Sequence, residues 1–227
     1  MLINMNNWRN LDFLSNNLQY LLWQGYPFTS LPSNFEPYYL VELNMPDSSL
    51  QRLWEGCKEL PNLKSMDLSN SKYLIETPKF FSTPKLERLD FTGCTNLIQI
   101  HPSIGHLIKL VFLCLQNCSS LVDLDFGSIS RLCSLRVLRL SGCTKLEKTP
   151  DFTSASNLEY LDMDECTTLF KVHESIGDLT QLKFLSLRNC TNLVGMRNAF
   201  KMMTSLVTLD FCGCLSLTVL PLHCKLK

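Results

Sequence analysis

The chain has 227 residues, enough for one elongated domain, and its 21 basic residues balance 21 acidic ones. A formal net charge of zero excludes the strongly basic footprint of a nucleic-acid-binding surface or a polybasic membrane surface. The 11 cysteines are an odd number, and most of them recur at one position of a repeat, which favours a reducing compartment over a disulfide framework.

The first 17 residues precede any regular pattern. They contain Trp8, Leu11, Phe13 and Leu14, enough apolar surface to cover part of one end of a repeat array. They lack the apolar run of about 7 to 15 residues that follows a basic segment in a secretory signal peptide. No stretch of the chain approaches the roughly 18 apolar residues of a membrane span. We therefore expect residues 1–17 to be a partial cap and the remnant of a longer chain.

A single leucine pattern recurs nine times over residues 18–227. In the unit LRVLRLSGCTKL, residues 135–146, leucine fills the first, fourth, sixth and twelfth positions and Cys143 the ninth. An LxxLxLxx(N/C)xL core repeated every 22 to 25 residues is the signature of leucine-rich repeats. The first positions are Leu18, Leu40, Leu63, Leu86, Leu110, Leu135, Leu158, Leu182 and Leu206.

Each unit predicts one short strand. In residues 86–91, inward Leu89 and Phe91 alternate with outward Asp90, which is the two-residue period of a strand with one buried face. One unit buries too few side chains to fold alone, so the units must stack, pair their strands in parallel and share a core. We predict an α/β fold, a leucine-rich-repeat solenoid shaped as a right-handed horseshoe or arc of about nine repeats. A parallel concave sheet and a convex side of loops and short helices are expected.

The return segments predict short helical turns. Apolar residues three apart in Ile104–Leu107 and Ile176–Leu179 suit one helical or 3-10 turn each. The same spacing occurs in the pairs Ile129 with Leu132 and Phe200 with Met203. Prolines, which exclude regular helix, follow the inner leucine row at Pro78, Pro102, Pro150 and Pro221. We therefore expect more loop than helix.

Cysteine occupies the ninth position in six consecutive units. These ladder residues are Cys94, Cys118, Cys143, Cys166, Cys190 and Cys214. A column of cysteines one full repeat apart is best interpreted as small, weakly donating side chains that fill the turn where each strand ends. Zinc ligands come instead as short Cys-x-x-Cys pairs, so we predict no metal site.

The concave face carries the candidate binding residues. In four consecutive units the third position holds an apolar or aromatic side chain, and neighbouring positions supply arginines and carboxylates. The candidate partner-binding residues are Phe112, Val137, Arg139, Tyr160, Asp162, Asp164, Phe184 and Arg188. Aromatic anchors flanked by arginine and carboxylates are typical of protein-interaction hot spots. The alternative, in which the aromatic residues only shield the strand edges of neighbouring units, stays open.

No catalytic or cofactor-binding set is predicted. The histidines lie singly on expected convex loops, at His101, His106, His173 and His223. His173-Glu174-Ser175 has acid-base side chains, but no recurrent pocket or oriented nucleophile accompanies it. Four aspartates of the fifth column are interpreted as solvated charges rather than a cation site: Asp67, Asp90, Asp162 and Asp210. The sequence contains no GxxxxGK[ST] phosphate loop, so no cofactor is expected.

Three segments carry a family resemblance. They are LVELNMPDSSLQRLWEG at 40–56, LPNLKSMDLSNSKYLIETP at 60–78 and LERLDFTGCTNL at 86–97. They resemble the repeat domain of plant intracellular nucleotide-binding leucine-rich-repeat immune receptors, in the subclass with an amino-terminal Toll/interleukin-receptor-like domain. The likeness extends from about residue 11 to residue 221.

The resemblance implies a recognition and autoregulatory module without enzymatic activity. It implies a pathogen effector or host protein as ligand on the concave face and the nucleotide-binding domain of the parent receptor as a second partner. The zero net charge indicates no nucleic-acid or membrane partner. It also implies a cytoplasmic location, with the nucleus as a further one. ATP/ADP switching and NAD cleavage are not carried over, because the phosphate loop is absent and the chain is too short for the signalling domain.

Two further points follow from the ends of the sequence. The last complete unit reaches Leu220 and Pro221 without the polar cap that a solenoid end needs, so we expect a fragment of a longer protein or a truncated gene product. The alternative function is a stand-alone binding adaptor, such as the substrate-recruiting domain of a ubiquitin ligase, although the amino terminus does not resemble an F-box. An enzyme and an extracellular receptor domain are both disfavoured.

Overall fold

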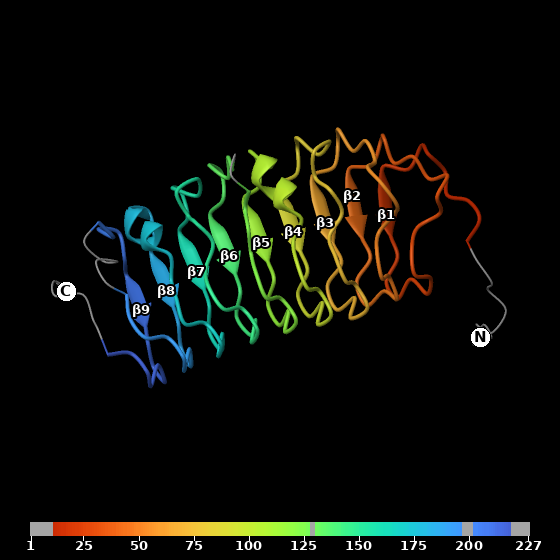
Figure 1. Cartoon of the computed structure of the whole chain (residues 1–227). Coiled ribbons are helices and arrows are strands. Elements are labelled where there is room, and N and C mark those ends of the chain that lie inside the picture. Colours follow the sequence, from red (N-terminus) through yellow and green to blue (C-terminus); the bar gives the residue numbers. More distant parts are fainter. Residues whose placement is uncertain (1–10, 128–129, 197–201, 219–227) are drawn as a thin grey trace.

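The computed structural model describes residues 11–127, 130–196 and 202–218. Nine parallel strands form one elongated sheet in sequence order, with β1 and β9 at its opposite ends (Figure 1). The strands are β1 (Tyr20–Leu22), β2 (Glu42–Asn44), β3 (Ser65–Asp67), β4 (Arg88–Asp90), β5 (Phe112–Cys114), β6 (Val137–Arg139), β7 (Tyr160–Asp162), β8 (Phe184–Ser186) and β9 (Thr208–Asp210). The predicted leucine-rich-repeat solenoid with a parallel sheet is confirmed.

Every strand pairs with the next at the same position of the repeat. Phe112 lies beside Val137, and Leu113 lies beside Leu138. All the other strand pairs keep this register. The difference between units of 22 and 25 residues is therefore absorbed outside the strands, and one face of the sheet stays buried along the whole array.

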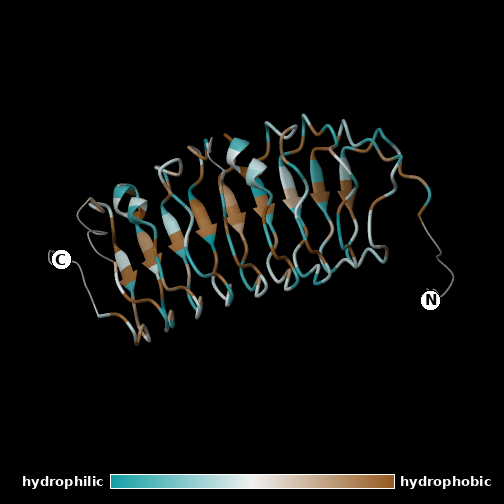
Figure 2. Cartoon of the chain, in the orientation of Figure 1, coloured by the Kyte–Doolittle hydropathy of each residue, from teal (hydrophilic) through white to brown (hydrophobic). Residues whose placement is uncertain are grey.

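The middle residue of each strand points into a leucine-rich core. Leu43, Leu113, Leu138 and Leu185 are fully buried there, and one cluster of buried apolar residues extends from Leu21 to residue 203. Figure 2 shows that the strands themselves mix apolar and polar residues, as expected of strands with one buried face. The first and third strand residues face outward, and we call the surface they form the sheet face.

The eighth position of every unit adopts a left-handed backbone conformation. Its φ angles lie between 58° and 78° at Gly25, Asp47, Asn70, Gly93, Asn117, Gly142, Glu165, Asn189 and Gly213. Glycine, asparagine and aspartate tolerate this region, because they lack a side chain or can hydrogen-bond locally. Glu165 is the exception in side-chain type, so this turn carries backbone strain.

A second backbone ladder runs along the array after these turns. The Ile98 amide donates to the Ile75 carbonyl oxygen at 3.0 Å, and the Val122 amide donates to the Ile98 carbonyl oxygen at 3.3 Å. The Phe170 amide likewise donates to the Glu147 carbonyl oxygen at 3.0 Å. We call this the return ladder. It holds the segments behind the sheet in the same one-to-one order as the strands.

Two 3-10 helices lie on the return segments, η2 (Pro102–His106) and η3 (Glu174–Asp178). They confirm the turns predicted at Ile104–Leu107 and Ile176–Leu179. Ile129 and Phe200, from the other two predicted turns, lie outside the described residues. The part of the chain that the structure describes contains no α-helix. It also contains no helix of the length and hydropathy that a membrane crossing requires.

Candidate functional site

A row of four outward side chains crosses strands β5 to β8 on the sheet face. Phe112, Val137, Tyr160 and Phe184 are register neighbours, and each is half-buried. The Tyr160 and Phe184 rings stack with their centroids 4.3 Å apart and their planes 4° apart. Neighbouring strands lie about 4.8 Å apart, so the register allows a stack of this kind when the two side chains adopt matching rotamers. The rings therefore shield one another, and each keeps part of its surface exposed.

Two arginines lie against this row. The Arg88 guanidinium carbon is 3.7 Å from the Phe112 ring centroid, and the same side chain forms an ion pair of 3.0 Å with Asp90. The Arg139 guanidinium carbon is 5.9 Å from the Phe112 centroid and 5.4 Å from the Tyr160 centroid. These are cation–π distances, which hold both guanidinium groups at the sheet face.

Arg139 is left with unused hydrogen-bonding capacity. Its Nε atom is buried and has no hydrogen-bond partner among the described residues. It lies in register with Cys114 on one side and Asp162 on the other, but it forms no ion pair within the described ranges. A buried donor without a partner is costly in free energy.

The carboxylates beside Arg139 are tied into the turns. Asp162 Oδ1 accepts the Asp164 amide at 3.1 Å. Asp164 Oδ1 accepts the Arg188 amide at 2.9 Å and the Ser186 hydroxyl. Burial raises the pKa of Asp162, and the Asp164 charge adds to that rise while Arg139 opposes it. Asp162 and Asp164 are therefore positioned groups rather than freely solvated charges.

All four fifth-column aspartates have the same structural role. Each accepts the backbone amide two residues later, from Ser69, Thr92, Asp164 and Cys212 respectively. This is an Asx turn, which closes the chain reversal after the strand. The sequence signal for this role was an aspartate at the end of these four predicted strands, followed by a turn. The interpretation of these aspartates as solvated charges overlooked that signal. Two other fifth-column residues, Cys114 and Ser186, are buried and add little to the surface.

The ladder cysteines bind the backbone of the preceding unit. Cys143 Sγ donates to the Leu115 carbonyl oxygen at 3.1 Å, and the other five thiols make the same contact at 3.0 to 3.3 Å. Burial raises the pKa of Cys94, Cys143 and Cys190 to about 12, so these sulfurs stay protonated. The described residues hold no group of three or more side chains suited to a metal ion. The thiols therefore donate hydrogen bonds instead of ligating or reacting.

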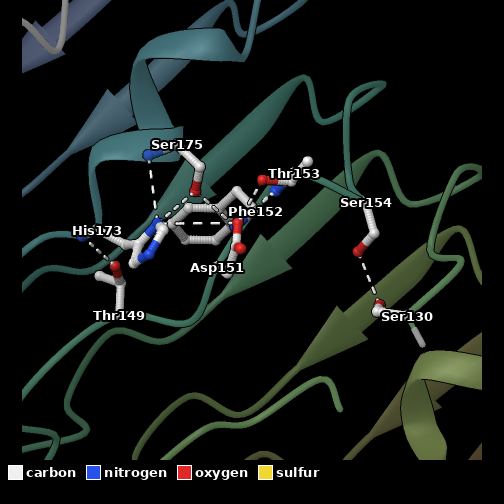
Figure 3. A network of polar contacts seen from close by, with 8 residues as sticks. All are labelled: Ser130, Thr149, Asp151, Phe152, Thr153, Ser154, His173 and Ser175. Atoms are coloured by element: carbon white, nitrogen blue, oxygen red, sulfur yellow. Dashed lines mark hydrogen bonds and ion pairs between the residues drawn. The ribbon is translucent and has the colours of Figure 1, made fainter. Parts of the chain in front are cut away.

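A serine, a histidine and an aspartate meet on the return segments (Figure 3). His173 Nδ1 lies 2.8 Å from Ser175 Oγ and 3.8 Å from Asp151 Oδ1. In a hydrolytic triad the aspartate and the serine face opposite ring nitrogens, whereas both face Nδ1 here. Ser175 is also buried and accepts the Phe152 amide at 2.8 Å. The cluster therefore lacks the geometry of a nucleophile site.

The same arrangement recurs three repeats earlier, where it explains the role of both histidines. His101 Nδ1 accepts the Ser103 amide at 3.1 Å, and Ser103 Oγ accepts the Phe80 amide at 2.8 Å. His101 and His173 are the N-cap residues of η2 and η3. Lys79 stands where the other copy has Asp151, so the carboxylate is not part of the shared motif. The histidines cap 3-10 helices, and both need an unprotonated Nδ1 for this.

The His101 cap makes stability depend on pH. Burial lowers the pKa of His101, Lys79 lowers it further, and Glu76 opposes them. A folded pKa below the unfolded value of about 6.5 means that the unfolded chain binds more protons. The stabilisation is present above about pH 6.5 and is lost as the pH falls through the lowered folded pKa. We expect His101→Asn, which can cap without titrating, to reduce the loss of unfolding free energy between pH 7 and 5, measured by urea denaturation.

His106→Asn is the matched control, because His106 is exposed on the same 3-10 helix and does not cap it. It should keep the wild-type pH dependence of the unfolding free energy. An equal change in both variants would contradict the capping role of His101.

Comparison with known proteins connects the fold to a family. A family model described as Leucine Rich Repeat matches residues 39–58. The chain is 41% identical over 172 residues to disease resistance protein RPP2A of Arabidopsis thaliana, covering 76% of this chain and 13% of that protein. It is 40% identical over 141 residues to TMV resistance protein N of Nicotiana glutinosa, covering 62% and 12%. The chain thus spans only a small part of the relatives it matches, and the family resemblance inferred from the sequence is confirmed.

Solved structures agree on the architecture. The leucine-rich repeat domain of the type III effector XopL superposes with a TM-score of 0.74 at 25% identity, covering 86% of this chain and 69% of that one. InlP of Listeria monocytogenes gives a TM-score of 0.50 at 20% identity, covering 81% and 44%. Identity this low supports the fold alone.

Proposed function

Because the chain is a leucine-rich-repeat domain similar in sequence to plant disease resistance proteins, we propose that it is the protein-recognition and autoregulatory module of a plant intracellular immune receptor. Its sheet face is the concave binding face of the solenoid. It binds a pathogen effector, or a host protein that an effector modifies. Before this ligand binds, the module contacts the nucleotide-binding domain of the parent receptor. The proposed location is the cytoplasm, with the nucleus as a further one.

The observation that carries the proposal is the chemistry around Arg139. Aromatic rings on both sides hold its guanidinium group, and its buried Nε lacks a partner among the described residues. Arginine and tyrosine at the centre of a half-buried aromatic row are enriched at the positions that dominate binding energy. The guanidinium carries further N–H donors besides the buried Nε, and an acceptor on the ligand would gain a charge-assisted hydrogen bond from them.

A binding role rather than a catalytic one fits the remaining side chains. Five of the six ladder thiols are buried, burial raises the pKa of Cys143 to about 12, and the Ser175 cluster serves as a helix cap. Repeat arrays of this kind offer an extended surface, which suits a macromolecular ligand. We therefore propose that the module has no enzymatic activity of its own.

Replacement of Phe112, Tyr160 and Phe184 together by serine should abolish ligand binding while leaving the fold intact. The wild-type chain is expressed in plant tissue, and the proteins that it retains are identified. Each is then purified and its dissociation constant measured by calorimetry. Because hot-spot truncations cost about 2 kcal/mol or more each, the triple variant should bind at least about 100-fold more weakly.

The matched control replaces three exposed apolar residues away from the sheet face, Tyr38, Phe81 and Ile108, by serine. It should bind as the wild type does. Equal binding by the sheet-face variant, or loss of its circular-dichroism spectrum, would contradict the proposal. The genomic sequence upstream offers an independent check, since a phosphate-loop domain encoded there supports the receptor assignment and an F-box would replace it with the adaptor.

A further inference from the structure

A second exposed apolar row lies on the return ladder, away from the sheet face. The thirteenth position is apolar in five of six consecutive units, at Ile75, Ile98, Val122, Phe170 and Val194, and these side chains are 41 to 54% exposed. Glu147 interrupts the row once. We call this surface the return stripe. Single exposed apolar residues are ordinary, but a row repeated at solenoid period marks an interaction surface.

The stripe is rigid because its own backbone forms the return ladder. The Glu147 amide donates to the Val122 carbonyl oxygen at 3.4 Å, which continues the ladder across the gap in the apolar row. At about 4.8 Å per unit, the five steps from Ile75 to Val194 span roughly 24 Å. A preformed row of this length needs little ordering when it binds.

Charges beside the stripe are divided between its two halves. The fourteenth position reads Glu76, Gln99, Asp123, Lys148 and Lys171, all exposed. Isolated parallel β-bridges join the backbone of Glu76 to that of Gln99, and Gln99 to Asp123. Another such bridge joins Lys148 to Lys171. The adjacent lysines repel each other. Within the described ranges, none of the four charged side chains forms an ion pair.

We propose that the return stripe is a self-association surface, on which a second copy of this chain docks antiparallel about a two-fold axis. In a two-fold interface the same patch meets itself, so each contact occurs twice. The antiparallel direction places the fourteenth-position acidic residues of one copy opposite the fourteenth-position lysines of the other, and it places the apolar row, with Glu147 inside it, against its own copy. A parallel direction would oppose like charges. The charge pattern is therefore complementary to itself in one orientation only.

The proposed dimer is weak and leaves the sheet face free. A row of five side chains falls short of the roughly 800 Å² per partner of a standard interface, so a dissociation constant of about 10 to 100 µM is expected. Exposed charge pairs are screened by salt, so the dimer should weaken as ionic strength rises. The ligand-binding residues and the stripe residues do not overlap.

Charge exchange tests the orientation directly. Sedimentation velocity of the full chain, from about 1 to 200 µM, should show a reversible monomer–dimer equilibrium. Lys148→Glu with Lys171→Glu makes all four charges negative, and Glu76→Lys with Asp123→Lys makes all four positive. Each double variant should dimerise at least about tenfold more weakly than the wild type. An equimolar mixture of the two should dimerise again, and so should the chain carrying all four exchanges.

Three results would overturn the proposal. They are a wild-type chain that stays monomeric throughout, double variants that dimerise like the wild type, and a mixture that stays monomeric although both variants retain the wild-type circular-dichroism spectrum. The sheet-face triple serine variant should dimerise normally. Failure of the ligand-binding proposal and failure of the self-association proposal are therefore distinguishable.

Discussion

Replacement of Leu138 by alanine is expected to lower the free energy of unfolding by about 3 to 4 kcal/mol. Leu138 is the fully buried middle residue of β6, paired with Leu113 on one side and Leu161 on the other. Both neighbouring strands are held in register, so the space left by the lost methyl groups cannot collapse. Urea denaturation followed by circular dichroism measures the loss.

Leu209→Ala is the control for this prediction. Leu209 occupies the same position in β9 but is only partly buried, with a strand on one side among the described residues. Its truncation should cost about 1 kcal/mol, because less apolar surface is lost and the cavity is open. Equal losses at the two positions would contradict a core that is continuous through the middle of the array. In an array whose units contact only their neighbours, the Leu138 variant should also unfold less cooperatively.

Replacement of Gly142 by alanine is expected to lower the free energy of unfolding by about 2 to 4 kcal/mol. Backbone strain and overpacking both contribute to this loss. Gly142 has a φ of 75°, and a Cβ atom there would lie 2.2 Å from Asn117 Oδ1. The exposed Asn117 side chain can rotate away, but the Asn117 Cα atom would lie 3.3 Å from the added Cβ, and the backbone of both residues is held in place. The Gly142 amide donates to the Asp164 carbonyl oxygen at 2.8 Å, and the Asn117 amide donates to the Ser141 carbonyl oxygen at 2.7 Å.

Gly25→Ala separates the two causes. Gly25 occupies the same left-handed position with a φ of 67°, but no atom lies within 4 Å of its added Cβ. Its alanine variant should lose only the strain component, about 1 to 2 kcal/mol. Glu165→Asn should act in the opposite direction and stabilise the chain, because asparagine tolerates φ of 60° better than glutamate. Similar losses in the two glycine variants, measured by thermal and urea unfolding, would exclude the Asn117 contact as a cause.

The strands and their faces could be predicted from the sequence because they depend on local alternation. Leu138 and Leu161 are buried in the middle of the strands, and the third-column residues Phe112 and Tyr160 face outward, as the leucine pattern indicates. Because the same leucine pattern recurs in nine units, any other register between neighbouring strands would turn buried leucines toward solvent. The short turns at Ile104–Leu107 and Ile176–Leu179 followed from the same spacing argument.

Contacts between units could not be predicted in this way. The stacking of Tyr160 on Phe184 and the unpaired Nε of Arg139 depend on rotamers chosen across strands. The aspartate turns and the left-handed eighth position have a sequence signal, in the recurrent Gly, Asn and Asp residues, but its meaning depends on where each strand ends. The return stripe was missed because Ile75 and its equivalents resemble core residues until the return ladder shows which side they face.

The position-for-position pairing of the strands bears on how such a surface changes over generations. Since the described strands all pair with their neighbours at the same position of the repeat, duplication or deletion of one whole coding unit leaves the register of the array unchanged. Unequal crossing-over between repeats therefore lengthens the chain by about 4.8 Å per added copy without disturbing its interior. The gene can thereby move an aromatic or charged residue to a new place along the array in a single recombination event.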